Sequence, residues 1–172
     1  TRAWELTLGA LLALGAVLEG RHEYAIVDAN REPDPIARLR ERAATGARAI
    51  GVTAMPGPQL ARAAEASRIL KQEFPALAVV WGGYFPTEHP AACLASGYVD
   101  YVVRGHGEHA FLQLLESLER GSSPPPVPGL GWREPGGGLR PGTVAPVPDP
   151  ESLPTFPFHR LEVPDYMRDT FL

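Results

Sequence analysis

The stretch AIGVTAMPGPQLARAAEASRILKQEFPALAVVWGG, residues 49–83, decides the fold. Its two ends, residues 49–54 and 77–82, are short β-branched and apolar runs of the kind that form buried parallel strands. Residues 59–74, between them, alternate apolar and charged positions with the period of an amphipathic helix, and Pro75 ends that pattern. A strand, a helix and a strand in this order predict two parallel strands joined by a crossover helix.

The same alternation continues on both sides of this stretch. Two further strands are predicted at residues 24–29 (YAIVDA) and 99–104 (VDYVVR), and further helices at residues 35–45, 90–96 and 108–120. Strands that alternate with helices at this spacing predict an α/β fold of three α/β/α layers with a parallel sheet, which we assign to residues 1–121.

An apolar run, residues 6–18, precedes the first of these strands. A membrane span needs roughly 20 apolar residues, so this run is too short and is predicted to be a buried helix. A signal-peptide core is the competing interpretation, but no convincing cleavage site follows the run.

The composition changes after Gly121, because 12 of the 19 prolines lie in the last 52 residues. We assign residues 122–172 to a second segment, in which residues 129–134 and a stretch around Leu139 form a small hairpin. The rest is too rich in proline for a helix or a central strand and is predicted to be a strap or linker.

Charge and cysteine content exclude several classes of function. The net charge is -4 and the basic residues form no run, so no nucleic-acid partner is expected. The single cysteine, Cys93, can form no internal disulfide and cannot supply the thiolates of a zinc or iron–sulfur site. No metal site is therefore predicted, and a reducing compartment, the cytoplasm, is expected.

Three loops follow the predicted parallel strands, and ligands of open parallel sheets bind at that edge. Residues 53–59 (TAMPGPQ) offer a hydroxyl, a thioether and a Pro-Gly-Pro turn, and residues 81–90 (WGGYFPTEHP) place two glycines at a strand end. Residues 104–110 (RGHGEHA) form another glycine-flanked turn into a helix. A bulky ligand could approach the main chain closely at such glycines.

The first two loops carry a resemblance. Flavodoxin-like cobalamin-binding domains have a Ser/Thr-x-Leu-type signature after one strand and Gly-Gly after the next, which here are Thr53-Ala54-Met55 and Gly82-Gly83. From about Leu6 to Glu119 the chain resembles the cobalamin-binding domain that precedes the barrel of radical S-adenosylmethionine proteins, and the hairpin and strap resemble the connection to that barrel. The resemblance implies a bound cobalamin, no catalytic residue in this chain, and a site lined by Thr53, Met55, Gly57, Gly82, Gly83, Thr87, Arg104, Gly105 and Gly107. The [4Fe–4S] cluster and S-adenosylmethionine would belong to the barrel, which this chain does not contain.

The resemblance also implies features that this chain lacks. The family's strand order is 2-1-3-4-5, and strand 1, which would precede the apolar helix, is expected between residues 24–29 and 49–54. Relatives often have Pro-His where this chain has Tyr84-Phe85. The Asp-x-His-x-x-Gly loop that presents a histidine to cobalt in the methionine-synthase-like branch is absent from residues 1–9. The implied cobalamin therefore has its own base displaced and no protein histidine beneath the metal.

The alternative is a nucleotide- or flavin-binding Rossmann-like domain of an oxidoreductase. Residues 105–110 match G-x-G-x-x-A between a strand and a helix, but that fingerprint belongs after the first strand of a βαβ unit, with another strand to follow. A flavin-binding domain of the same fold stays open, since a fold does not determine its ligand. A metal site at His106 and His109 would need further ligands.

Overall fold

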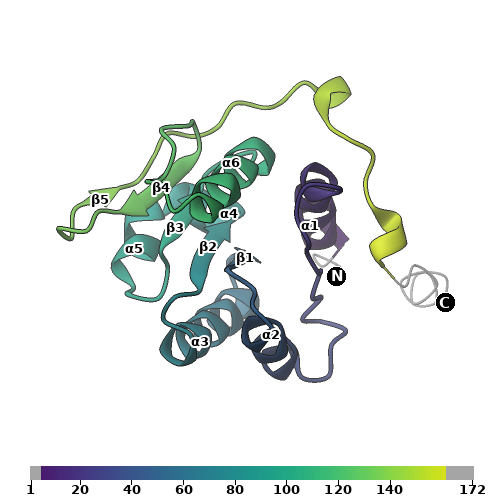
Figure 1. The fold of residues 1–172 in the computed structure, drawn as a ribbon, viewed down its shortest axis with the longest axis horizontal. Helices are drawn as coiled ribbons and strands as arrows, with labels where there is room; N and C mark the ends of the chain where they lie inside the picture. The colour runs from purple at the N-terminus through teal and green to yellow at the C-terminus, as the bar shows by residue number, and fades with distance from the viewer. Residues whose placement is uncertain (1–4, 162–172) are drawn as a thin grey trace.

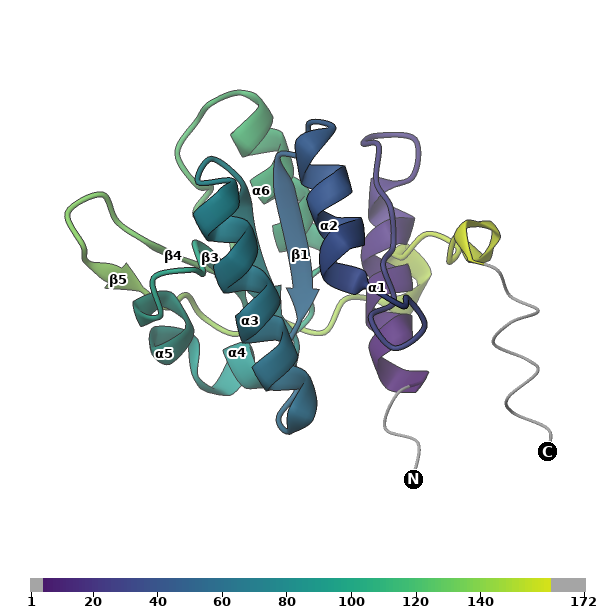
Figure 2. The ribbon, with the colours of Figure 1, turned by 90° about the horizontal axis from the view of Figure 1, so that it is seen from below.

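The computed structural model describes residues 5–161, and the last part of the predicted strap, residues 162–172, lies outside the described residues. One sheet is sandwiched between helices (Figures 1 and 2). The helices are α1 (Glu5–Leu18), α2 (Pro35–Ala44), α3 (Pro58–Glu73), α4 (Tyr84–Glu88), α5 (Pro90–Ala95) and α6 (Glu108–Glu119), and the two short 3-10 turns are η1 (Pro150–Ser152) and η2 (Phe158–Arg160). The strands are β1 (Ala49–Thr53), β2 (Ala78–Gly82), β3 (Tyr101–Val103), β4 (Leu130–Arg133) and β5 (Leu139–Arg140).

The sheet has the order β1-β2-β3-β4-β5. β1, β2 and β3 are parallel, with Thr53 opposite Gly82 and Trp81 opposite Val102, so the predicted α/β class and parallel sheet are confirmed. β4 pairs antiparallel with β3, and β5 pairs antiparallel with β4. The hairpin that we assigned to the second segment thus continues the same sheet.

The prediction of a strand at residues 24–29 is wrong. These residues run extended but belong to no strand of the described chain, and β1 is the edge of the sheet. A cleft of about 1590 Å³ separates them from β1, and its walls include Leu14, Leu39 and Phe111. An extended segment without a neighbour at ladder distance cannot form strand hydrogen bonds. The cleft lies where the resemblance expects a further strand.

The two faces of the sheet carry separate apolar clusters. On one face, Val80 and Val103 pack with Leu18 of α1 and Leu114 of α6. On the other face, Val79 and Trp81 pack with α5 and with Leu60, Ala63 and Ala64 of α3. A buried hydrogen bond fixes α3 on β2, because the indole N–H of Trp81 donates to the hydroxyl of Ser67 over 2.9 Å. The packed faces leave the carboxyl ends of the parallel strands as one edge.

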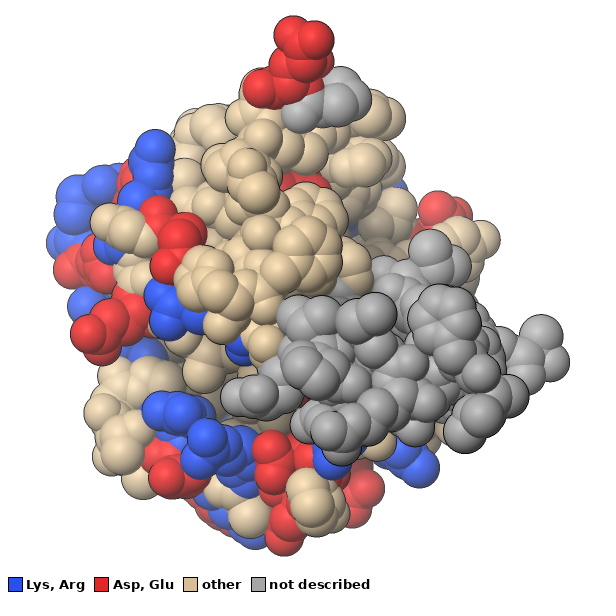
Figure 3. Space-filling view, turned by 90° about the vertical axis from the view of Figure 1, so that its right-hand side faces the viewer, with Lys and Arg blue, Asp and Glu red and all other residues tan. Residues whose placement is uncertain are grey.

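The predicted apolar helix is α1, whose described side chains pack against α6. Within residues 5–161, no helix is long and apolar enough to cross a membrane. Figure 3 looks onto the side of the molecule where α1 lies, and shows a broad uncharged surface flanked by Lys, Arg, Asp and Glu.

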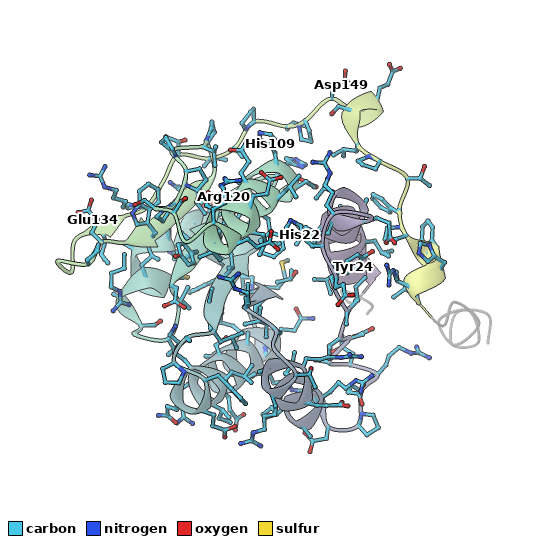
Figure 4. The ribbon with its side chains drawn as sticks, viewed as in Figure 1. His22, Tyr24, His109, Arg120, Glu134 and Asp149 are labelled. Carbon is cyan, nitrogen blue, oxygen red and sulfur yellow. The ribbon has the colours of Figure 1, made fainter. Side chains whose placement is uncertain are left out.

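The end of the described chain returns to α1, where four side chains form a latch: Glu19, Tyr24, His159 and Arg160. The guanidinium of Arg160 donates to both carboxylate oxygens of Glu19, over 2.7 and 3.2 Å, and lies 4.9 Å from the centre of the Tyr24 ring. The Tyr24 hydroxyl donates to the same carboxylate over 2.5 Å, beside α1 (Figure 4). His159 Nε2 is 3.6 Å from Glu19 Oε1. The proline-rich strap is therefore fixed at its far end.

Candidate functional site

The loops after β1 and β2 are joined by main-chain hydrogen bonds. The N–H of Ala54 donates to the carbonyl of Gly82 over 2.8 Å, and the N–H of Phe85 donates to the carbonyl of Ala54 over 3.1 Å. The two motifs that the sequence analysis paired, Thr53-Ala54-Met55 and Gly82-Gly83, are thus brought side by side.

Thr53 and Gly82 also share a face of the sheet. A Cβ on Gly51 would lie 3.1 Å from the Phe111 ring of α6, and residues two apart on a strand point to the same face. Thr53 therefore points to the face covered by α1 and α6, as does Gly82 opposite it. The Thr53 side chain is partly exposed, and its hydroxyl makes no hydrogen bond within the described residues. It is free to bind a ligand.

At most glycine positions of the predicted site, the backbone conformation or the packing of the protein requires a glycine. Gly57, Gly83 and Gly105 have φ of 103°, 95° and 76°, which L side chains rarely adopt. A Cβ on Gly105 would also lie 2.8 Å from the carbonyl of Ala145, and one on Gly107 would lie 2.9 Å from Val103. The fold alone accounts for these four.

Gly82 is different. Its φ is not positive, and a Cβ there would meet nothing closer than 3.8 Å, the carbonyl oxygen of Val103. An alanine would suit both the backbone and the neighbours, and strands disfavour glycine. The main chain of Gly82, which carries no side chain although a Cβ would fit there, lies beside the free hydroxyl of Thr53, and it is the place in this site where a ligand could contact the backbone.

The remaining predicted site residues take different positions. Met55 is partly buried in the β1 loop, and Gly57 caps the start of α3 with open space around it. Thr87 lies in α4, a helix of five residues that the sequence analysis did not predict. Arg104 follows β3 and is partly buried. The hydrogen bonds of Thr87 and Arg104 all go to the protein backbone.

The sequence analysis missed the return of residues 141–145 to this edge. Gly105 forms an isolated bridge with Ala145, whose N–H donates to the carbonyl of Arg104 over 2.9 Å. Val144 in this segment is 52% exposed although apolar. Proline-rich composition masked the contact, and Gly105, which the sequence analysis assigned to the ligand site, is required by the close approach of Ala145.

Within the described part of the chain, none of the five histidines belongs to a group that could bind a metal ion. His22 bridges to Glu119 at the end of α6, and the His89 ring contacts Phe85 at 4.9 Å between ring centres (Figure 4 labels His22 and His109). His106 and His109 are exposed, and His109 contacts Gln113. The described residues hold no group of three or more His, Cys, Asp or Glu side chains that could bind a metal ion.

Cys93 is a packing residue. It is buried in the apolar cluster that includes Leu94 and Val99, and burial raises the pKa of its thiol to about 11. A thiol with this pKa is almost entirely protonated near neutral pH, so Cys93 is not a nucleophile.

Comparison with known proteins agrees with this geometry. Residues 6–115 match the family model of the B12 binding domain. A curated relative, the anaerobic magnesium-protoporphyrin IX monomethyl ester cyclase of Synechocystis sp., is 28% identical over 129 residues, which are 73% of this chain and 26% of the relative.

Solved structures show the same fold. The cobalamin-dependent S-adenosylmethionine radical enzyme OxsB, with aqua-cobalamin and S-adenosylmethionine bound, superposes with a TM-score of 0.72 at 16% identity, over 86% of this chain and 21% of that one. The radical S-adenosylmethionine methyltransferase TsrM from Kitasatospora setae superposes with a TM-score of 0.63 at 27% identity, over 81% of this chain and 27% of its own. The chain thus spans about a quarter of the length of these relatives.

Proposed function

The chain belongs to the B12 binding domain family, and from that we propose that it holds a cobalamin at the carboxyl ends of β1, β2 and β3. The nucleotide tail would lie against the main chain of Gly82 beside the Thr53 hydroxyl, and the corrin would cover the loops. The single observation that carries this proposal is Gly82, whose missing side chain is explained neither by its backbone nor by its neighbours.

The donor set fits such a ligand. A nucleotide tail has phosphate and ribose oxygens that hydrogen-bond to hydroxyls and main-chain N–H groups, and Thr53 offers a hydroxyl without a partner in the described residues. We propose that Thr53, Met55, Gly57, Gly82, Gly83, Gly105 and Gly107 line the site. The corrin is large and partly apolar, which suits the thioether of Met55 and the exposed glycines around it.

We propose that the cobalt receives no histidine from this chain. The Asp-x-His-x-x-Gly loop that presents a histidine to cobalt in the methionine-synthase-like branch is absent from residues 1–9. His89 contacts Phe85, and His22 and His159 contact Glu119 and Glu19. His106 and His109, in and after the loop that follows β3, are the histidines that the test below must exclude. The resemblance to the family implies that the cobalamin would bind with its own base displaced.

The domain would work in a longer protein. Its relatives are about three times as long, and we propose that a radical S-adenosylmethionine barrel follows it and holds the [4Fe–4S] cluster and S-adenosylmethionine. When bound, cobalamin would carry a methyl group or assist the radical step. The residues of this chain would bind and orient the cofactor without catalysing a step, and a cytoplasmic location is consistent with the free thiol of Cys93.

The alternative, a nucleotide- or flavin-binding oxidoreductase domain, is not favoured. The G-x-G-x-x-A match at residues 105–110 follows β3, the last parallel strand, and the next strand, β4, is antiparallel. A dinucleotide fingerprint requires a parallel strand after its helix.

The test is to mix the protein, with the native residues that flank this domain, with hydroxocobalamin, remove free cofactor by gel filtration and record absorption. Electron paramagnetic resonance of the Co(II) state then reports the axial ligand. We expect retained cobalamin with a base-off spectrum and no nitrogen hyperfine splitting. FMN and NAD serve as controls and should not be retained. Loss of cobalamin on the column would refute the function, and nitrogen splitting that disappears in His106→Ala would refute the binding mode.

A further inference from the structure

The Thr87 hydroxyl connects two of the three loops at the proposed cofactor edge. It donates to the carbonyl of Gly83 over 2.8 Å and accepts from the N–H of Gly105 over 3.0 Å. A threonine hydroxyl has one hydrogen, so its donor is fully used within the protein. The hydroxyl that resembles a ligand contact in the sequence is thus committed to the loops after β2 and β3.

Arg104 extends this connection to the strap. Its Nε donates to the carbonyl of Thr87 over 3.0 Å and its Nη1 donates to the carbonyl of Gly142 over 2.5 Å. Its own N–H and C=O pair with Gly129 and Ala145. Within residues 5–161 it has no carboxylate partner, so its planar fork of donors binds backbone only.

The glycines at both ends of the Thr87 link have restricted geometry. Gly83 and Gly105 hold positive φ, and because glycine can adopt many other conformations, contacts with neighbours must select the one seen here. Gly83 directly follows Gly82, the residue over which the ligand would lie. The position of the Gly82 main chain therefore depends on what holds Gly83.

We propose that Thr87 is a positioning residue, which fixes the cofactor edge by linking the β2 and β3 loops, with Arg104 carrying the link to residues 141–145. This inference rests on the proposed function, and it replaces a direct contact of Thr87 and Arg104 with the cofactor. Loops that are already ordered before binding lose less conformational entropy when the ligand arrives, which raises affinity.

The test compares Thr87→Val, which keeps the shape but removes both hydrogen bonds, with Thr87→Ser, which keeps the hydroxyl. Amide hydrogen exchange is followed by NMR in the cofactor-free protein, and the affinity for hydroxocobalamin is measured by titration. Since two hydrogen bonds disappear, Thr87→Val should raise the amide exchange rate of Gly105 about tenfold. The Kd for hydroxocobalamin should also rise about tenfold. Thr87→Ser should restore both to near the parent values. The N–H of Val79, which donates to the Asp100 carboxylate near the opposite end of β2, is the internal control and should not change.

Three results would overturn the proposal. Unchanged exchange at Gly105 in Thr87→Val, with weaker binding, would mean direct contact with the cofactor. Equally weakened binding and equally fast exchange in Thr87→Ser would exclude the hydroxyl as the cause, and faster exchange at both Gly105 and Val79 would indicate general unfolding. If the parent protein binds no hydroxocobalamin, the proposed function fails, and the exchange of Gly105 alone then decides whether Thr87 links the loops.

Arg104 is tested by Arg104→Lys and Arg104→Gln. Lysine keeps the charge but has no planar guanidinium that can donate to the carbonyls of Thr87 and Gly142 at once. Both variants should therefore weaken hydroxocobalamin binding to a similar extent. Full binding by Arg104→Lys combined with loss in Arg104→Gln would instead assign Arg104 to a charge contact with the cofactor.

Discussion

Replacing Gly82 with alanine should have opposite effects on the stability of the fold and on the affinity for the cofactor. The new Cβ would lie 3.8 Å from the Val103 carbonyl oxygen and 3.9 Å from the Val103 Cβ, which are ordinary contacts. Glycine in a strand costs about 0.5–1 kcal/mol relative to alanine, so the cofactor-free variant should gain about that much stability. For a protein of this size the gain corresponds to a rise in Tm of about 1–4 °C.

Binding should change in the opposite direction. An extra methyl group in a packed contact costs about 1–3 kcal/mol, which predicts a Kd for hydroxocobalamin raised roughly 5- to 150-fold. Affinity is measured by absorbance titration, and Tm by circular dichroism without cofactor. A variant that binds as tightly as the parent would refute the placement of the ligand over Gly82.

Two matched glycines serve as controls. Gly136 in the β4–β5 turn has open space and no positive φ, so Gly136→Ala should leave the Kd unchanged. Gly51 lies on the same face as Gly82, but a Cβ there would be 3.1 Å from the Phe111 ring, so Gly51→Ala should lower the Tm. If Gly82→Ala lost stability as Gly51→Ala does, weaker binding would be explained by damage to the fold.

Four further predictions concern the rest of the molecule. Glu19→Gln should open the latch and speed tryptic cleavage after Arg160, whereas Glu151→Gln, in the exposed strap, should not; equal rates would contradict the latch. Hydrogen bonds from Arg160 and Tyr24 lower the pKa of Glu19 to about 2. The latch is therefore fully stabilised above the unfolded-state pKa near 4.5, and this stabilisation is lost as the pH falls through about 2. The NMR resonances of the Tyr24 ring should report the loss. The Cys93 thiol, with its pKa raised to about 11, should react with a thiol reagent at pH 8 only after unfolding in guanidinium, and a rapid reaction of the native protein would show that the thiol is accessible. Native residues upstream of Thr1, if they supply the strand expected beside β1, should raise the Tm and suppress self-association, and no change in either would mean that β1 needs no such neighbour.

The elements that sequence patterns predicted well are those with strong local signals. The observed α3 ends at Glu73, directly before Phe74 and Pro75, and β2 ends at the Gly-Gly turn, because proline and glycine restrict the backbone at those positions. Residues 24–29 have the same β-branched composition as β2 and yet form no strand. Composition gives the preference of a segment, whereas a strand also requires a partner at ladder distance.

The contacts that were missed connect residues distant in sequence. β4 pairs with β3 across a proline-rich segment, and Arg104 bonds to Gly142, 38 positions away. The α4 helix was missed for a local reason, because it is about one turn long and contains Pro86. A first helical turn tolerates proline, but in a sequence proline usually indicates a loop. Neither periodicity nor turn chemistry contains information about such distant pairing.

Glycines show most clearly what sequence cannot decide. Five glycines of the predicted site have the same residue type and lie in similar loops, yet four of them are needed by the backbone or by packing within the protein. Only the structure separates these from Gly82, since the distinction depends on φ and on what a Cβ would meet. The same reasoning applies to Thr87 and Thr53, two threonines on one edge. The hydroxyl of Thr87 bonds to two loops, whereas that of Thr53 bonds to no group within residues 5–161. A ligand contact is therefore expected at Thr53, whose hydroxyl has no partner in the described residues, and at Gly82, where neither φ nor packing requires a glycine.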